Sequence, residues 1–152
     1  MSTAALPALD EHSVDIDAGI DGVWQALLAA LDGSFSRPFA TVYSRAIGSA
    51  HARASGPRPL AVGSTIPGFR VATAVPGREL ALEGRHHFST YALTFHIDEL
   101  GPDRSRLRAE SNAAFPGLHG RAYRLLVVST GFHVASVRRL LTGIRHRAEH
   151  PG

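Results

Sequence analysis

The stretch HSVDIDAGIDGVWQALLAALDG, residues 12–33, decides the fold because one hydrophobic periodicity replaces another within it. Apolar and polar residues alternate over 12–18, which puts Val14 and Ile16 on the same side of the chain. A period of two residues is typical of a half-buried β-strand. We therefore expect a strand at 12–18.

The residues that follow have the spacing of an amphipathic helix. Apolar side chains recur every three or four residues, at Ile20, Val23, Trp24, Leu27, Leu28 and Leu31. Asp21 in the first turn suits the positive end of the helix dipole, and Gly33 is placed to end the helix.

The second half of the chain contains a series of strand candidates separated by turns. They lie at 68–75, 78–88, 90–100 and 106–115, and a further strand is expected over 39–47. Short strands that are joined by tight turns form an antiparallel meander. The sequence therefore predicts one antiparallel sheet of six or seven strands.

The last part of the chain, 118–149, is predicted to be one long helix. Its apolar face is broad and comprises Leu118, Ala122, Leu125, Leu126, Ser129, Phe132, His133, Val137, Leu140, Leu141 and Ile144. Such a helix laid across a curved sheet would cover the apolar face of that sheet.

This order of elements carries a resemblance to a known family. The stretches VDIDAGIDGVWQALLAAL at 14–31 and VPGRELALEG at 75–84, with the terminal helix, resemble the SRPBCC superfamily of START, polyketide cyclase and Bet v 1-like proteins. One departure is Gly19, which stands where the usual pattern has a proline. The resemblance implies an α+β helix-grip fold, with a curved antiparallel sheet wrapped around a long C-terminal helix. It also implies an apolar cavity between the sheet and that helix.

The resemblance covers a single domain at 12–149, and we expect residues 1–11 to form a flexible N-terminal tail. No apolar run approaches the roughly 20 residues that span a bilayer, so no membrane span is expected. The chain has no cysteine, which fits a cytoplasmic location.

The adjacent histidines His86 and His87 raise the question of a metal site. Neighbours in a strand point to opposite faces, so the two imidazoles cannot bind one metal unless Gly84 introduces a bulge. HRAEH at 146–150 fits a zinc-protease pattern, but it lies at the end of the terminal helix without a third ligand. We expect no metal and no cofactor.

Strand parity and the helix stripe define a predicted ligand-binding set. Its members are Phe69, Val71, His86, Phe88, Tyr91, Leu93 and Phe95 from the sheet and Leu125, Ser129, Phe132 and His133 from the helix. His86 and His133 would be the polar groups of an otherwise apolar pocket. On the next strand, Leu107, Ala109, Ser111 and Ala113 also point inward, and their small side chains leave room for a cavity.

Three functions remain open from the sequence. The first is binding of an apolar small molecule, either a lipid or a polyketide-like compound. The second is an aromatase/cyclase-type enzyme in which His86 or His133 acts as general acid–base. The third is a protein-interaction module. All 16 basic residues are arginines without interleaved aromatics, so no nucleic-acid partner is expected, and a homodimer remains open.

Overall fold

The computed structural model of the chain describes residues 8–35, 59–66, 69–85, 90–114 and 132–151, together with Gly56 and Arg121. The strand expected at 39–47 and the first part of the terminal helix lie outside these residues. None of the described helices is long and apolar enough to cross a membrane.

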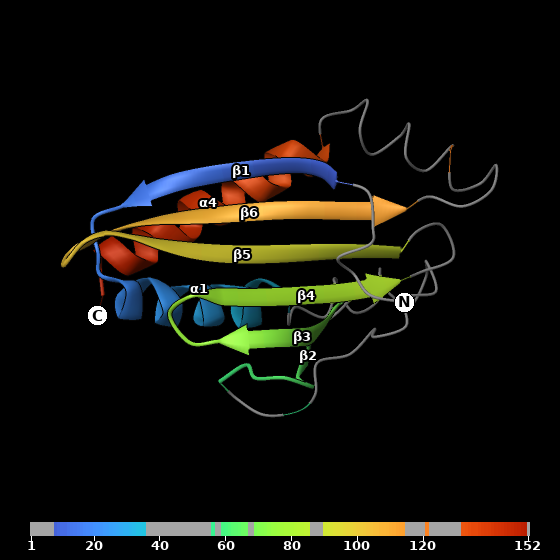
Figure 1. The fold of residues 1–152 in the computed structure, drawn as a ribbon, viewed down its shortest axis with the longest axis horizontal. Coiled ribbons are helices and arrows are strands. Elements are labelled where there is room, and N and C mark those ends of the chain that lie inside the picture. Colours follow the sequence, from blue (N-terminus) through green and yellow to red (C-terminus); the bar gives the residue numbers. More distant parts are fainter. Residues whose placement is uncertain are drawn as a thin grey trace.

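The described residues form a six-stranded sheet and two helices (Figure 1). The elements are β1 (Ala8–Ile16), α1 (Ile20–Phe35), β2 (Thr65–Ile66), β3 (Phe69–Val75), β4 (Glu79–Arg85), β5 (Thr90–Gly101), β6 (Arg104–Ala114) and α4 (Phe132–Glu149). The strand order is β1-β6-β5-β4-β3-β2, and every neighbouring pair is antiparallel. The meander predicted from the sequence is confirmed.

Strand β1 starts earlier than the sequence indicates. It begins at Ala8, which pairs with Asn112 of β6, so residues 8–11 belong to the sheet and not to a flexible tail. The register shifts between Ala8 and Asp10, which interrupts the alternation that the sequence reading relied on. Backbone pairing with the long strand β6 continues past the point where the side-chain pattern stops.

Strand β4 has no bulge at Gly84. Glu83, Gly84 and Arg85 pair without a break with Ala92, Tyr91 and Thr90. The bulge in this part of the sheet is on β3, where the register shifts between Val71 and Thr73. Leu80, Leu82 and Gly84 therefore lie on one face as predicted.

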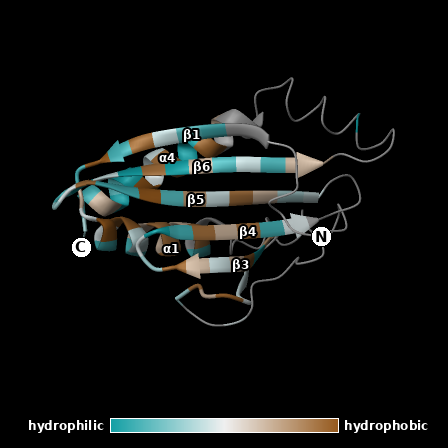
Figure 2. Cartoon of the chain, viewed as in Figure 1, coloured by the Kyte–Doolittle hydropathy of each residue, from teal (hydrophilic) through white to brown (hydrophobic). Residues whose placement is uncertain are grey.

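Both helices lie on the same face of the sheet, which we call the inner face. In Figure 1 they lie behind the strands; α4 packs against β1 and α1, and α1 packs against β5 and β6. The alternation of hydrophobic and hydrophilic residues is visible as coloured bands along the strands in Figure 2. The fully buried side chains include Ile16, Val23, Leu27, Leu31, Leu80, Leu82, Phe95, Leu107 and Ile144.

The junction between β1 and α1 accounts for the glycine at position 19. A Cβ atom at Gly19 would lie 2.8 Å from the carbonyl oxygen of Pro102, in the turn between β5 and β6. The Gly19 carbonyl also accepts the first helical hydrogen bond, from the Val23 amide at 3.1 Å. Position 19 must therefore be small because another part of the backbone lies against it.

We predict that Gly19→Ala destabilises the protein by about 1–3 kcal/mol, the range for overpacking a closed contact. Gly22→Ala is the matched control, because its new Cβ atom would make only an ordinary 3.8 Å contact with Ala18. The control should gain up to about 1 kcal/mol from helix propensity. Urea unfolding measures both changes, and equal stabilities for the two variants would contradict the prediction.

Candidate functional site

The inner face has one end where its side chains are not fully covered. This aromatic end consists of Phe69, Gly84, Tyr91 and Ala113, and it lies on the side of the sheet where β4 and β6 end. The rings of Phe69 and Tyr91 meet edge to face, with centroids 5.1 Å apart and planes inclined by 76°. Both side chains are half-buried, whereas Leu82 and Phe95 further along the same face are fully buried.

Burial along the inner face decreases toward the aromatic end. Phe95 and Val71 are fully covered by the core, and Leu93 is nearly so. The pairing of Tyr91 with Ala113 and of Leu93 with Ser111 puts small side chains beside the larger ones. The aromatic end thus combines accessible ring surface with small neighbours, a combination typical of the floor of a ligand pocket.

The structure describes part of the ligand-binding set predicted from the sequence. Phe69, Val71, Tyr91, Leu93 and Phe95 all lie on the inner face, as strand parity requires. The side chains of the remaining members are not described. For Phe132 and His133 only the backbone is described, in the first turn of α4. The others lie outside the described residues: His86, Phe88, Leu125 and Ser129. Their place in the pocket stays a prediction.

The sequence reading missed one polar residue of the inner face. His12 pairs with Ala109 on β6 and is half-buried. It shares the parity of Val14 and Ile16, so its side chain leaves β1 on the inner side. Carrying the alternation back by one step would have revealed it.

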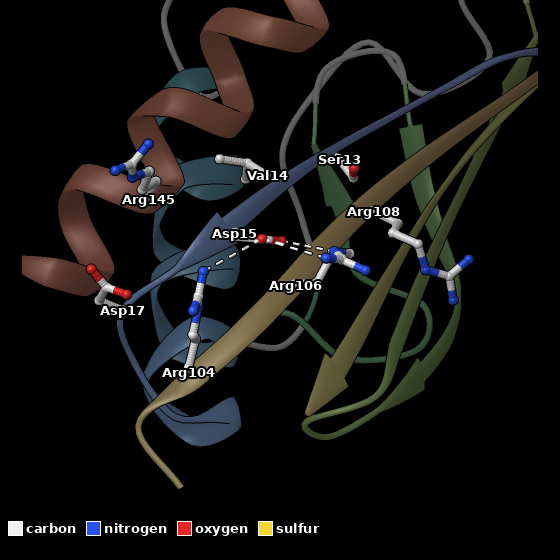
Figure 3. A pocket seen from close by; sticks show the side chains of 8 residues that line it. All are labelled: Ser13, Val14, Asp15, Asp17, Arg104, Arg106, Arg108 and Arg145. Carbon is white, nitrogen blue, oxygen red and sulfur yellow. Dashed lines mark hydrogen bonds and ion pairs between the residues drawn. The ribbon is translucent and has the colours of Figure 1, made fainter. Parts of the chain in front are cut away.

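The outer face of the sheet carries ion pairs. In Figure 3, a hollow of about 610 Å³ is lined by Ser13, Val14, Asp15, Asp17, Arg104, Arg106, Arg108 and Arg145. Arg106 donates to the Asp15 carboxylate through Nε at 2.7 Å and Nη2 at 3.4 Å, and Arg104 Nη2 lies 3.7 Å from the same group. The hydrogen bond from Arg106 holds the pKa of Asp15 below its usual value.

A second carboxylate of the outer face lies beside Arg108. Arg108 donates to Asp98 at 2.7 and 3.2 Å and to Glu11 at 3.3 Å, so it links β6 to both neighbouring strands. The hydrogen bond from Arg108 lowers the pKa of Asp98. These arginines of β6 are thus engaged with carboxylates of the protein itself.

The end of α4 is tied to the β1–α1 junction. The Asp17 amide donates to Glu149 Oε2 at 2.8 Å, and this bond, followed by the charge of Arg145, lowers the pKa of Glu149. His146 and His150 stack with ring centroids 4.5 Å apart. Glu149 of the HRAEH stretch thus has a structural role, and no three His, Asp or Glu side chains of the described residues are grouped to hold a metal.

Solved structures with this arrangement identify the fold. No protein-family model matches the sequence, and no curated protein is significantly similar to it. The Zhui aromatase/cyclase from Streptomyces sp. R1128 superposes with a TM-score of 0.60 over 92% of both chains, at 14% identity. The chain has a helix-grip fold. The sequence resemblance to SRPBCC proteins is therefore confirmed at the level of the fold.

Other helix-grip structures superpose equally widely. CalU16 from Micromonospora echinospora aligns with 96% of this chain and 84% of its own, at 16% identity and a TM-score of 0.56. A truncated norcoclaurine synthase from Thalictrum flavum aligns with 97% of this chain and 98% of its own, at 9% identity and a TM-score of 0.57. At such low identities the similarity is one of fold.

The ion pairs of the outer face predict an acid-dependent loss of stability. A carboxylate whose pKa is lowered by folding stabilises the protein above its unfolded pKa of about 3.9, and this contribution disappears as the pH falls through the folded value. Asp98→Asn should therefore lower the free energy of unfolding at pH 7, and the difference from the parent should shrink toward pH 3. Urea unfolding at both pH values measures this.

Asp103→Asn, in the exposed turn between β5 and β6, is the control for the loss of one negative charge. A difference between the parent and Asp98→Asn that is the same at pH 7 and pH 3 would exclude the ion pair as its cause.

Proposed function

We propose that this helix-grip protein binds an apolar small molecule between the inner face of its sheet and the C-terminal helix. The observation that carries the proposal is the half-buried Phe69–Tyr91 pair at the aromatic end, beyond the fully buried core. An accessible aromatic pair on an otherwise apolar face gains free energy by contact with a hydrophobic ligand, at about 25 cal/mol per Å² of apolar surface removed from water.

The chemistry of the inner face supports an apolar ligand over a charged one. The residues beside the aromatic pair are Val71, Leu82, Leu93 and Ser111, of which only Ser111 carries a polar group. The charged side chains of β6 described here, such as Arg106 and Arg108, belong to the outer face and are engaged with carboxylates. A lipid and a polyketide-like compound both fit this description. The proposal includes no metal or cofactor.

The second candidate is an aromatase/cyclase-type enzyme with the same pocket. Two observations support it. The inner face carries the imidazole of His12 and the hydroxyl groups of Ser111 and Tyr91. The structures that superpose on this chain include aromatase/cyclases and norcoclaurine synthase. Such a pocket would hold a flexible substrate in a reactive shape. His86 or His133 would then move the proton.

Filling the aromatic end should weaken ligand binding. Ala113→Phe places a ring beside Tyr91, on the surface that the ligand would contact, and we expect it to weaken binding of the neutral fluorescent probe N-phenyl-1-naphthylamine by about tenfold or more, which is about 1.4 kcal/mol of binding free energy. Ala114→Phe, whose side chain leaves the same strand on the opposite face, is the matched control. Equal binding by both variants, or no binding by the parent protein, would refute the proposed site.

Replacing the predicted pocket histidines should separate the two candidate functions. In a binding protein, His86→Ala or His133→Ala should cost roughly 1 kcal/mol of binding free energy per lost hydrogen bond. In an enzyme, the same variant should lower the rate about 10²–10⁴-fold while binding is largely kept. Native mass spectrometry of the purified protein identifies a co-purifying ligand, and this compound and its poly-β-ketone analogues are then the substrates for the rate measurement.

A further inference from the structure

The inner face is chemically divided across its strands near the aromatic end. On β3, β4 and β5 its described side chains are aliphatic or aromatic, as in the paired row Val71, Leu82 and Leu93. The same row continues onto β6 with Ser111, whose side chain is 4% exposed. One row further along, His12 of β1 pairs with Ala109 of β6. We call His12 and Ser111 the polar corner.

The two residues of the polar corner are neighbours. His12 lies opposite Ala109, and Ser111 is two residues further along β6 on the same face, so they form a diagonal cross-strand pair. Side chains in such pairs are about 7–8 Å apart at the backbone and can reach a common group. The described inner face holds a further buried serine, Ser105, but its hydroxyl donates to the Ala18 carbonyl at 2.8 Å, at the opposite end of the sheet.

The distance from the polar corner to the aromatic end sets the size of a ligand that touches both. Tyr91 is on β5 and His12 is on β1, with only β6 between them. Their rows are also four residues apart on β6, at Ala113 and Ala109, so the two backbones are roughly 16 Å apart, whereas Tyr91 and Ser111 are diagonal neighbours about 7–8 Å apart. A fused two-ring compound with its rings against Phe69 and Tyr91 therefore reaches Ser111 with an oxygen substituent, and His12, the diagonal neighbour of Ser111, approaches that oxygen from the other side.

The groups of the polar corner have hydrogen-bonding capacity for more than one partner. A serine hydroxyl offers one donor and two acceptor lone pairs, and an imidazole offers two ring nitrogens. Both residues interact with other groups of the protein. Each can therefore be held in place by the protein and still bind a ligand oxygen.

We propose that the polar corner, His12 and Ser111, selects ring compounds that carry a hydroxyl or carbonyl oxygen over plain hydrocarbons and unsubstituted acyl chains. This inference rests on the proposed function and narrows it, because it assigns the polar end of the ligand to β1 and β6 and the apolar end to β3 and β5. It also assigns ligand specificity to His12 and Ser111, which are different from the pocket histidines predicted from the sequence, His86 and His133.

The test compares naphthalene with 2-naphthol, which share a ring system and differ by one hydroxyl group. The parent protein should bind both, and the ratio of their dissociation constants is the measured quantity. Ser111→Ala and His12→Leu should each shift this ratio about 3–10-fold against 2-naphthol, the effect of one hydrogen bond. Ser13→Ala, next to His12 but on the outer face, should leave the ratio unchanged.

A conservative variant tests whether the effect of His12→Leu comes from a lost hydrogen bond or from a change in folding. His12→Gln keeps a hydrogen-bonding side chain and should restore part of the preference for 2-naphthol that His12→Leu loses. If both compounds bind but neither Ser111→Ala nor His12→Leu changes the ratio of their dissociation constants, the role proposed for the polar corner is wrong. The proposed binding function would then still stand. Binding of neither compound, nor of the phenylnaphthylamine probe, would overturn the proposed function itself.

Discussion

The packing of two helices on a single face of the sheet is the constraint on which the rest of the structure depends. On the described strands the other face carries the charged side chains and their ion pairs, so these strands alternate between an apolar and a polar face, and their register is fixed by that alternation. Val14 of β1, Leu107 of β6 and Ile97 of β5 show the result, since they form one row across three strands under the helices. A slip by one residue would expose all three.

The same constraint explains which parts of the fold follow from the sequence. Amphipathic periodicity reports burial on one face, and it therefore placed α1, the strand cores and the inner positions Leu80, Leu82, Phe95 and Leu107 correctly. It failed at the start of β1, where pairing with β6 and not side-chain burial holds Ala8 in the sheet. The bulge on β3 was also missed, because a register shift depends on both strands of a pair.

The candidate site was predictable to a smaller extent. Strand parity gave the inner direction of Tyr91 and Leu93, but it gave no measure of how far the helices cover that face. The difference between the fully buried Phe95 and the half-buried Tyr91 depends on where α1 and α4 lie in three dimensions.

The pairing of β1 with β6 has a consequence for how the chain folds during synthesis. The partners of His12 and Ile16 are Ala109 and Ser105, so the first strand leaves the ribosome roughly 90 residues before its neighbour exists. During this interval β1 is an unpaired edge with apolar residues on one side. Glu11 and Asp15 on its other side provide negative charge, which discourages pairing with another nascent chain. In the finished sheet both acids contact β6 arginines. The charges that keep the early strand soluble thus become part of its final attachment.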